Sequence, residues 1–369
     1  MKRIYLDHAA TTPLDPLARE QMMPWLTEEF GNPSSSYLEG RRAKAAIDLA
    51  REKLSNRLGC LFAEVLFTGS GTEAASMALI GAALANLDGN RRRILFSASE
   101  HHCVLHQQPI LQTLGYQVEL IPTDEEGVVR LDDLRAAMDD NVLIVGAMHA
   151  NNELGTFNPM EEISAIVHDH GALLFTDAVQ TLGTDELSST FLNDHHVDLA
   201  SFSAHKLYGP KGVGAIYIRA GTKMKPTIVG GAQEREMRAG TENVAAIVGF
   251  GAAVVQPRKS SRAAREAFDA ALDHRFRRTV VNAKKLDSHL HVLMPTGDAE
   301  TALIRLDRLG LSASSGAACS SGSIEPSHVL IACGYSEAEA RRGLRFTFGR
   351  DNTIEESQRA ASIVNQLLD

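Results

Sequence analysis

Two polar side chains follow apolar stretches of the chain at points where a β-sheet would end. Asp177 closes the apolar part of FTDAVQ (residues 175–180), and Lys206 follows the apolar start of SFSAHKLYGPKGVG (residues 201–214). A carboxylate in such a place is costly unless a cation meets it, so Asp177 either caps a helix or pairs with a protonated pyridine nitrogen. Partial burial of Lys206 between an apolar stretch and a glycine-proline turn would lower its pKa and make the amine a nucleophile that forms a Schiff base.

A glycine-rich turn offers a place for a phosphate group. In FTGSGTEAAS (residues 67–76), Gly71 turns the chain and a helix begins at Thr72, so backbone N–H groups and the positive end of the helix dipole point to one place. Ser203 and His205, beside Lys206, are further candidates to bind the same phosphate. The alternative is an ordinary turn in which Thr72 caps the helix.

A second functional interpretation of this turn is a dinucleotide fingerprint. Gly69, Gly71 and Ala74 fit the pattern G-x-G-x-x-A, and an acid, Glu100, follows the next apolar stretch. The spacing to Glu100 is long for a residue that binds a ribose. A nicotinamide enzyme would also leave Lys206 without a purpose.

Several histidines and a cysteine cluster at residues 101–106. His101, His102, Cys103 and His106 suggest metal ligands, but adjacent positions on a helix do not share a face, and no second matching cluster occurs. We therefore expect no metal. A flat imidazole such as that of His101 can instead lie over a cofactor ring and transfer protons.

An arginine and a cysteine near the C-terminus complete the candidate set. Arg345 lies in LRFTFGR (residues 344–350), an alternating apolar stretch, and either grips a substrate carboxylate through two hydrogen bonds or forms a surface salt bridge. Cys319 lies in SSGAACSSGS (residues 314–323), where small side chains and a permissive backbone predict a poorly ordered loop. Such a loop would let a thiol move between two positions.

The elements around these residues alternate between helices and strands, which predicts an α/β fold with a mostly parallel sheet flanked by helices. Near residues 256–280 the chain becomes charged and helical. We therefore expect a large domain over residues 15–255, and a smaller α+β domain from residues 1–14 and 256–369 that carries the Cys319 loop. The segments behind this expectation are helices at 41–58, 72–87, 161–171, 298–310 and 353–368, and strands at 64–69, 93–99, 142–149, 172–178, 197–204, 212–219, 289–295 and 344–350.

Composition excludes several classes of protein. The 369 residues carry a net charge of −9 with no basic run, which argues against binding nucleic acid. No apolar run approaches the ~20 residues that span a bilayer, and the start lacks the apolar core of a signal peptide. The four cysteines form no C-x-x-C pair. We expect a cytoplasmic protein with reduced thiols.

Nine stretches in order carry a resemblance to a known family. The stretches are YLDHAATTP, FTGSGTEA, SEHHCVL, MHANNELG, TDAVQTLG, SFSAHKLYGPKGVG, MRAGTEN, SSGAACSSGSIEPSHVL and LRFTFGR. From Tyr5 to about Arg350 the chain closely resembles the cysteine desulfurases, a branch of the class V aminotransferases with pyridoxal-phosphate fold type I. Its sequence differs from the common family pattern at three positions. His102 stands where lysine is frequent, Cys103 where alanine is frequent, and His291 where asparagine is usual.

The resemblance implies pyridoxal 5'-phosphate as cofactor and L-cysteine as substrate. Lys206 would bind the cofactor covalently, His101 would stack on its ring and transfer protons, and Cys319 would be the nucleophile that takes the substrate sulfur as a persulfide and passes it to an acceptor. Asp177 would pair with the pyridine nitrogen, and Gln180 would bind the ring hydroxyl. Asn152 would contact the cofactor and, with Arg345, bind the substrate carboxylate, while Thr241 would bind a phosphate of the partner subunit. The residues implied at the phosphate are Gly71, Thr72, Ser203 and His205.

The role of Thr241 implies a homodimer, and the sulfur acceptor would be an iron–sulfur scaffold or a thiolation protein. Three other functions stay open at this stage. The protein could be a related enzyme that acts on selenocysteine or transfers an amino group, although plain transamination needs no thiol. A non-catalytic adaptor could keep the fold, but it would have no reason to keep Lys206, Asp177, His101 and Cys319 together.

Overall fold

A seven-stranded sheet forms the centre of the larger body of the protein. The computed structural model describes residues 3–256, 259–315 and 325–368. The strand order is β2-β8-β7-β6-β5-β3-β4, and the five strands from β7 to β4 run parallel while β2 and β8 run antiparallel to their neighbours. The expected mostly parallel sheet is therefore confirmed. The strands are β2 (Val65–Thr68), β3 (Arg93–Ser97), β4 (Gln117–Ile121), β5 (Val142–Gly146), β6 (Leu173–Asp177), β7 (Leu199–Ser203) and β8 (Gly214–Ile218).

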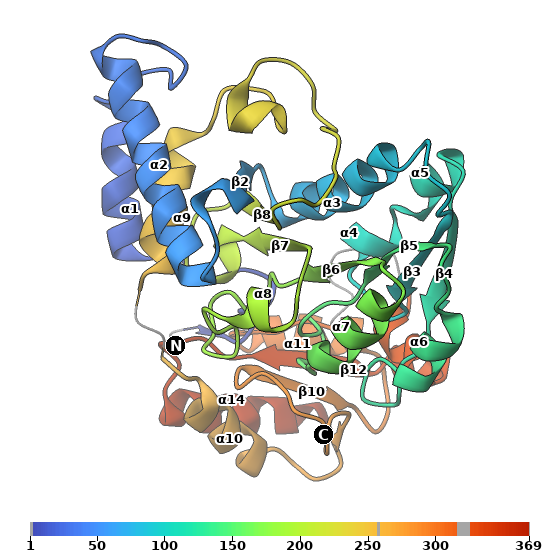
Figure 1. Cartoon of the computed structure of the whole chain (residues 1–369). Helices are drawn as coiled ribbons and strands as arrows, with labels where there is room; N and C mark the ends of the chain where they lie inside the picture. The colour runs from blue at the N-terminus through green and yellow to red at the C-terminus, as the bar shows by residue number, and fades with distance from the viewer. Residues whose placement is uncertain (1–2, 257–258, 316–324, 369) are drawn as a thin grey trace.

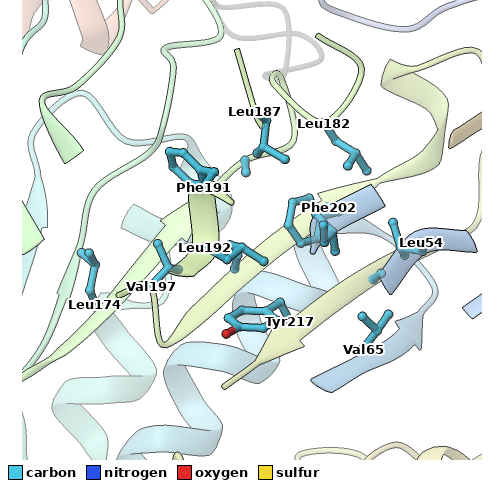
Figure 2. Packing of buried hydrophobic residues seen from close by; sticks show 14 of the residues in the cluster. Leu54, Val65, Leu174, Leu182, Leu187, Phe191, Leu192, Val197, Phe202 and Tyr217 are labelled. Carbon is cyan, nitrogen blue, oxygen red and sulfur yellow. The ribbon is translucent and has the colours of Figure 1, made fainter. Parts of the chain in front are cut away.

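Helices cover both faces of this sheet. Along β5 and β7 every residue is buried, because apolar side chains contact a layer of helices on each side. Figure 2 shows one of these apolar layers, in which Phe202 and Tyr217 of the sheet lie near Leu54 of a flanking helix. The helices of the larger body are α1 (Pro16–Met22), α2 (Leu38–Leu58), α3 (Gly71–Ala85), α4 (His102–Leu105), α5 (Gln108–Thr113), α6 (Leu131–Ala137), α7 (Met160–Asp169), α8 (Phe191–Asp194) and α9 (Val244–Val254).

A smaller body holds an antiparallel sheet of order β12-β10-β9. Its apolar cluster, which includes Phe268, Phe276 and Phe346, is separate from the clusters of the large sheet. Figure 1 shows α10, β10 and α14 together below the large sheet, with α1, α2 and α9 grouped at one side. The elements are β1 (Ile4–Tyr5), α10 (Arg262–Ala271), β9 (Arg277–Arg278), β10 (His289–Leu293), α11 (Ala299–Arg308), β11 (Leu311–Ser312), α12 (His328–Ala332), α13 (Glu337–Ala340), β12 (Gly343–Thr347) and α14 (Ile354–Asn365).

The structure contains elements that the sequence patterns did not indicate, among them β4 and the helices α1, α6 and α9. β4 was not expected, because its pattern is polar and only its last residue, Ile121, is buried. β8 returns antiparallel to β7, since the short connection between them allows a hairpin and no crossover helix. The charged segment after residue 256 is helical only in α10. The domain boundaries at residues 15 and 255 stay a prediction.

None of the helices in the described part of the chain combines the length and the apolar composition that crossing a membrane requires.

A buried ion pair joins α2 to the edge of the large sheet. The two terminal nitrogens of Arg51 donate to the two carboxylate oxygens of Glu234 at 2.7 Å each, and less than a tenth of either residue is exposed. The Glu234 carboxylate also accepts the backbone N–H of Phe67 at 2.8 Å. Glu234, Arg235 and Glu236 all have positive φ angles, of 43°, 58° and 65°, which is costly for residues with a side chain. The Arg51–Glu234 pair therefore stabilises a strained turn.

We predict that Arg51→Met lowers the free energy of unfolding by about 3–5 kcal/mol, because it leaves the Glu234 carboxylate buried without a cation. Urea denaturation at a fixed protein concentration measures the change. Lys44→Met is the matched control, since Lys44 pairs with Asp48 at 3.1 Å on the exposed face of the same helix and should contribute about 1 kcal/mol or less. Equal losses in the two variants would contradict the prediction.

Candidate active site

A cavity of about 360 Å³ lies at the carboxyl ends of the parallel strands, where open α/β sheets bind ligands. Ten of the twelve residues singled out in the sequence line it. The exceptions are Thr241, which lines a different cavity with Glu234 and Arg238, and Cys319. Cys319 and its predicted loop order lie outside the described residues. The ten are Gly71, Thr72, His101, Asn152, Asp177, Gln180, Ser203, His205, Lys206 and Arg345.

One end of the cavity is formed by the first turn of α3. Ser70 caps this helix, since its hydroxyl accepts the N–H of Glu73 at 3.0 Å. A Cβ atom at Gly71 would lie 2.9 Å from a methyl group of Val179, so only glycine fits where the helix meets the opposite wall. The Cβ atom of Ser203, at the end of β7, lies 3.3 Å from the same position. The free backbone N–H groups of a helix start, with Ser203 beside them, are suited to an anion such as phosphate.

His205 lies in the same wall and is a neutral imidazole. Burial lowers its pKa to about 4, and the charges of Lys206 and Lys211 add to this effect. Its Nδ1 atom lies 3.1 Å from the hydroxyl of Thr11. A neutral ring that can donate one hydrogen bond suits an anion site without adding a charge.

Asp177 places a carboxylate at the bottom of the cavity. One of its oxygens, Oδ1, accepts the backbone N–H of Val179 at 2.9 Å, and Oδ2 faces the Cys103 thiol at 3.7 Å. Burial raises the pKa of Asp177, while these two donors and the hydroxyl of Ser201 act against the rise. A buried carboxylate that borders a cavity fits a ligand with a protonated ring nitrogen, because that pairing supplies the missing cation.

His101 and Lys206 bring the proton-transfer groups into the same space. The Nδ1 atom of His101 accepts the backbone N–H of Cys103 at 3.1 Å, so the proton of the neutral ring is on Nε2. Burial lowers the pKa of His101 to about 4, and the charge of Lys206 is the next cause. The Lys206 amine donates to the carbonyl oxygens of Ala9 and, at 2.9 Å, of Ala10.

Arg345 and Asn152 form the opposite end of the cavity. Arg345, on β12, donates to the backbone oxygen of Asn152 and to the carboxylate of Asp7, both at 2.8 Å. Its Nε atom and the side-chain oxygen of Asn152 are buried, and neither has a hydrogen-bond partner among the described residues. Such groups require a polar partner, which a bound substrate would supply. Arg345 also pairs with Ser314, at the start of the stretch that contains Cys319.

The structure weakens the two other interpretations of these residues. His102 stacks on His106 at 4.4 Å and on His328 at 4.2 Å, so the rings lie face to face and do not point at a common centre. Within the described ranges, no group of three or more His, Cys, Asp or Glu side chains is arranged to hold a metal. Glu100 is fully buried and accepts the backbone N–H of Met148, so its carboxyl is not available to a ribose.

Sequence reasoning missed the contacts that four residues make in the site. Asp7 is the acidic partner of Arg345, the carbonyls of Ala9 and Ala10 accept from Lys206, and Cys103 contacts Asp177. The stretch YLDHAATTP was noticed only as part of a resemblance. Its distance in sequence from Arg345 and Lys206 hid the contacts, although a carboxylate directly after the apolar residue Leu6 was a usable signal.

Comparisons with known proteins agree on one family. A family model described as aminotransferase class-V matches residues 4–359. The cysteine desulfurase IscS of Dictyoglomus turgidum is 40% identical over 100% of this chain and 95% of its own length. A solved NifS-like protein is 33% identical with a TM-score of 0.91 and covers 99% of both chains. SspA, solved in complex with cysteine, is 32% identical with a TM-score of 0.84 and covers 95% of this chain and 100% of its own.

Two histidines behind Arg345 should make stability depend on pH. Burial, and next the charge of Arg345, lower the pKa of both His289 and His291 to about 3. The unfolded chain binds a proton at each histidine below about pH 6.5, whereas the folded chain does not until near pH 3. Each of the two therefore costs about 1.4 kcal/mol of stability per pH unit as the pH falls below 6.5.

We predict that His291→Asn lowers the number of protons that the chain binds on unfolding by about one between pH 6 and 4.5. The free energy of unfolding of the variant should fall less steeply on acidification, by about 1.4 kcal/mol per pH unit. Urea denaturation across this range measures the slope. His274→Asn, at a position whose side chain is 94% exposed, should keep the wild-type slope. A His291→Asn slope equal to that of wild type would contradict the burial argument.

Proposed function

The chain belongs to the class-V aminotransferase family, and from this premise we propose that it is a cysteine desulfurase. It converts L-cysteine to L-alanine and transfers the sulfur to Cys319. The observation that carries the proposal is that Lys206, Asp177, His101 and Arg345, from distant parts of the chain, line one cavity.

The cavity fits pyridoxal 5'-phosphate. The backbone N–H groups at the start of α3, near Gly71, would bind the phosphate together with Thr72, Ser203 and His205. Asp177 would pair with the ring nitrogen, and Gln180, whose amide donates to the Ala9 carbonyl at 3.2 Å, would reach the ring hydroxyl. When bound, this cofactor withdraws electrons from the carbon that carries the amino group of the substrate.

The other end of the cavity fits the substrate. The unpartnered Nε atom of Arg345 and the side chain of Asn152 would bind the carboxylate of L-cysteine. Asp7 fixes the direction of the guanidinium and leaves that nitrogen for the ligand. The solved SspA complex with cysteine, at 32% identity, supports the choice of substrate.

The residues of the chain would then move protons and sulfur. Lys206 would hold the cofactor through its amine and would move protons at the substrate carbon. His101, with Nδ1 occupied by the Cys103 N–H, donates and accepts protons through Nε2. Both groups border the cavity.

Cys319 completes the reaction as the nucleophile. Its thiolate attacks the substrate sulfur, a new S–S bond forms, the C–S bond breaks, and the carbon takes up a proton to give L-alanine. The sum is L-cysteine plus the Cys319 thiol giving L-alanine plus the Cys319 persulfide. The persulfide sulfur then passes to an acceptor protein, such as an iron–sulfur scaffold or a thiolation protein.

A homodimer would complete each site. Thr241 is exposed and lines a separate cavity of its own chain, so within one chain it is not among the residues around Lys206. We propose that it reaches the phosphate bound in the partner subunit. Such an arrangement makes cofactor affinity depend on the dimer.

We predict that Cys319→Ala keeps cofactor binding and loses sulfur transfer, whereas Lys206→Ala loses both. Purified protein should be yellow, and with L-cysteine and a thiol reductant it should release equal amounts of alanine and sulfide. Cys60→Ala is the matched control, because burial raises the pKa of this thiol to about 12 and makes it unreactive. Undiminished sulfide release by Cys319→Ala, or a colourless wild-type protein, would overturn the proposal.

The role of Thr241 can be tested by mixing subunits. In a dimer of one Lys206→Ala and one Thr241→Ala chain, a Thr241 that acts in the partner leaves one site intact, so the mixture should regain up to half of the wild-type rate per mixed dimer. If Thr241 acts within its own chain, both sites of the mixed dimer are damaged and mixing restores nothing. Alanine release after refolding the two variants together distinguishes the outcomes.

A further inference from the structure

Two buried carboxyl groups are associated with the proposed cofactor site: Asp177 lines its cavity, and Glu100 contacts Met148, which lines the same cavity. Asp177 ends β6, and Glu100 follows β3 by three residues. Asp177 is 8% exposed and Glu100 is not exposed at all. Two neighbouring carboxyl groups in an apolar interior do not both ionise, because like charges repel and water is absent. The proposed pairing with a ring nitrogen requires the charge to be on Asp177.

Hydrogen-bond donors are distributed unequally between the two groups. Asp177 has a donor at each oxygen, the N–H of Val179 at 2.9 Å and the thiol of Cys103 at 3.7 Å. Glu100 accepts the N–H of Met148 at Oε1, while its Oε2 is buried and has no partner among the described residues. An unpartnered oxygen costs far less on a neutral acid than on a carboxylate. The geometry therefore favours the charge on Asp177 and the proton on Glu100.

The backbone of Cys103 is held by hydrogen bonds at both its N–H and its carbonyl group. The N–H of Cys103 donates to His101 Nδ1 at 3.1 Å, and its carbonyl accepts the side-chain amide of Gln107 at 2.9 Å. The side chain is 8% exposed and lines the same cavity as Asp177. One residue thus orients the imidazole of His101 through its backbone and contacts the carboxylate of Asp177 through its side chain.

We propose that Cys103 and Glu100 are positioning residues that place a single negative charge on Asp177, the thiol by donating to the carboxylate and Glu100 by holding the proton. This inference rests on the proposed function only for its purpose, which is to keep Asp177 ionised for a ring nitrogen. The partition of charge itself is a property of the protein alone.

The electrostatic environment agrees with this geometry. Burial raises the pKa of Glu100 well above its ordinary value, and the charge of Asp177 adds to the rise. Burial also raises the pKa of Asp177, but there the Val179 N–H, the Ser201 hydroxyl, the Cys103 thiol and the charge of Lys206 act in the opposite direction. The groups that face the pair are thus a cation and donors beside Asp177, and one N–H beside Glu100.

Infrared spectroscopy of the full-length protein, with and without added pyridoxal 5'-phosphate, tests the partition. The band of a buried carboxylate at pH 7 should persist in Glu100→Gln, because Glu100 is already neutral, and it should disappear in Asp177→Asn. Loss of that band in Glu100→Gln would overturn the assignment of the charge. Glutamine keeps an oxygen for the Met148 N–H, so the variant preserves the local hydrogen bond.

A series at Cys103 tests the donor. Cys103→Ala and Cys103→Val remove the donor and should raise the pH at which the Asp177 band is lost by about 0.5–1 unit, while Cys103→Ser keeps a donor and should not. Valine is close to cysteine in volume, so packing and donation are separated. A serine variant that shifts together with valine, or no shift in any variant, would overturn the role of Cys103.

The two proposals fail in different ways. If the band shifts occur but no variant or wild type releases alanine from L-cysteine, the proposed function is wrong and the charge partition holds. If wild type is an active desulfurase and the Cys103 series shows no shift, the proposed function holds and the role of Cys103 is wrong.

Discussion

The hydrogen bonds of Arg345 connect three parts of the chain that are far apart in sequence. The guanidinium comes from the small sheet, Asp7 from the N-terminal segment, and the Asn152 carbonyl from the loop after β5 of the large sheet. Arg345 is buried and Asp7 is half-buried, so loss of Asp7 would leave a buried guanidinium without its carboxylate. This contact joins the small body to the N-terminal segment and to the large body beside the cavity, which Arg345 and Asn152 line.

The charges around the cavity follow from the burial of its residues. His101, His205 and His289 all lose proton affinity on burial beside cations, so the positive charge of the site is concentrated on Lys206 and Arg345. The negative charge of the site is on Asp177 and Asp7, which accept hydrogen bonds from neighbouring donors. A zwitterionic amino acid and a phosphorylated cofactor with a basic ring nitrogen have charges that match this distribution.

Much of the fold and most of the candidate site could be predicted from local sequence patterns. The strand before Asp177, the helix start at Gly71 and the strand before Lys206 are short apolar or glycine-rich signals that do not depend on distant residues, and the structure has all three. β4 escaped prediction because an edge strand with a polar pattern carries no such signal. The partnership of Asp7 with Arg345 escaped it because 338 residues separate the two in sequence.

The sequence by itself determined which chemical groups are present, that Asp177 and Lys206 follow apolar strands, and that a helix starts at Gly71. That follows from periodicity and turn residues, which act over a few positions. Only the tertiary structure decided which of these groups face one another, that Cys103 contacts Asp177 and that Glu100 is buried away from any ligand. The physical reason is that charge, protonation and hydrogen bonding in a buried site depend on neighbours in space, and chain packing brings those neighbours from anywhere in the sequence.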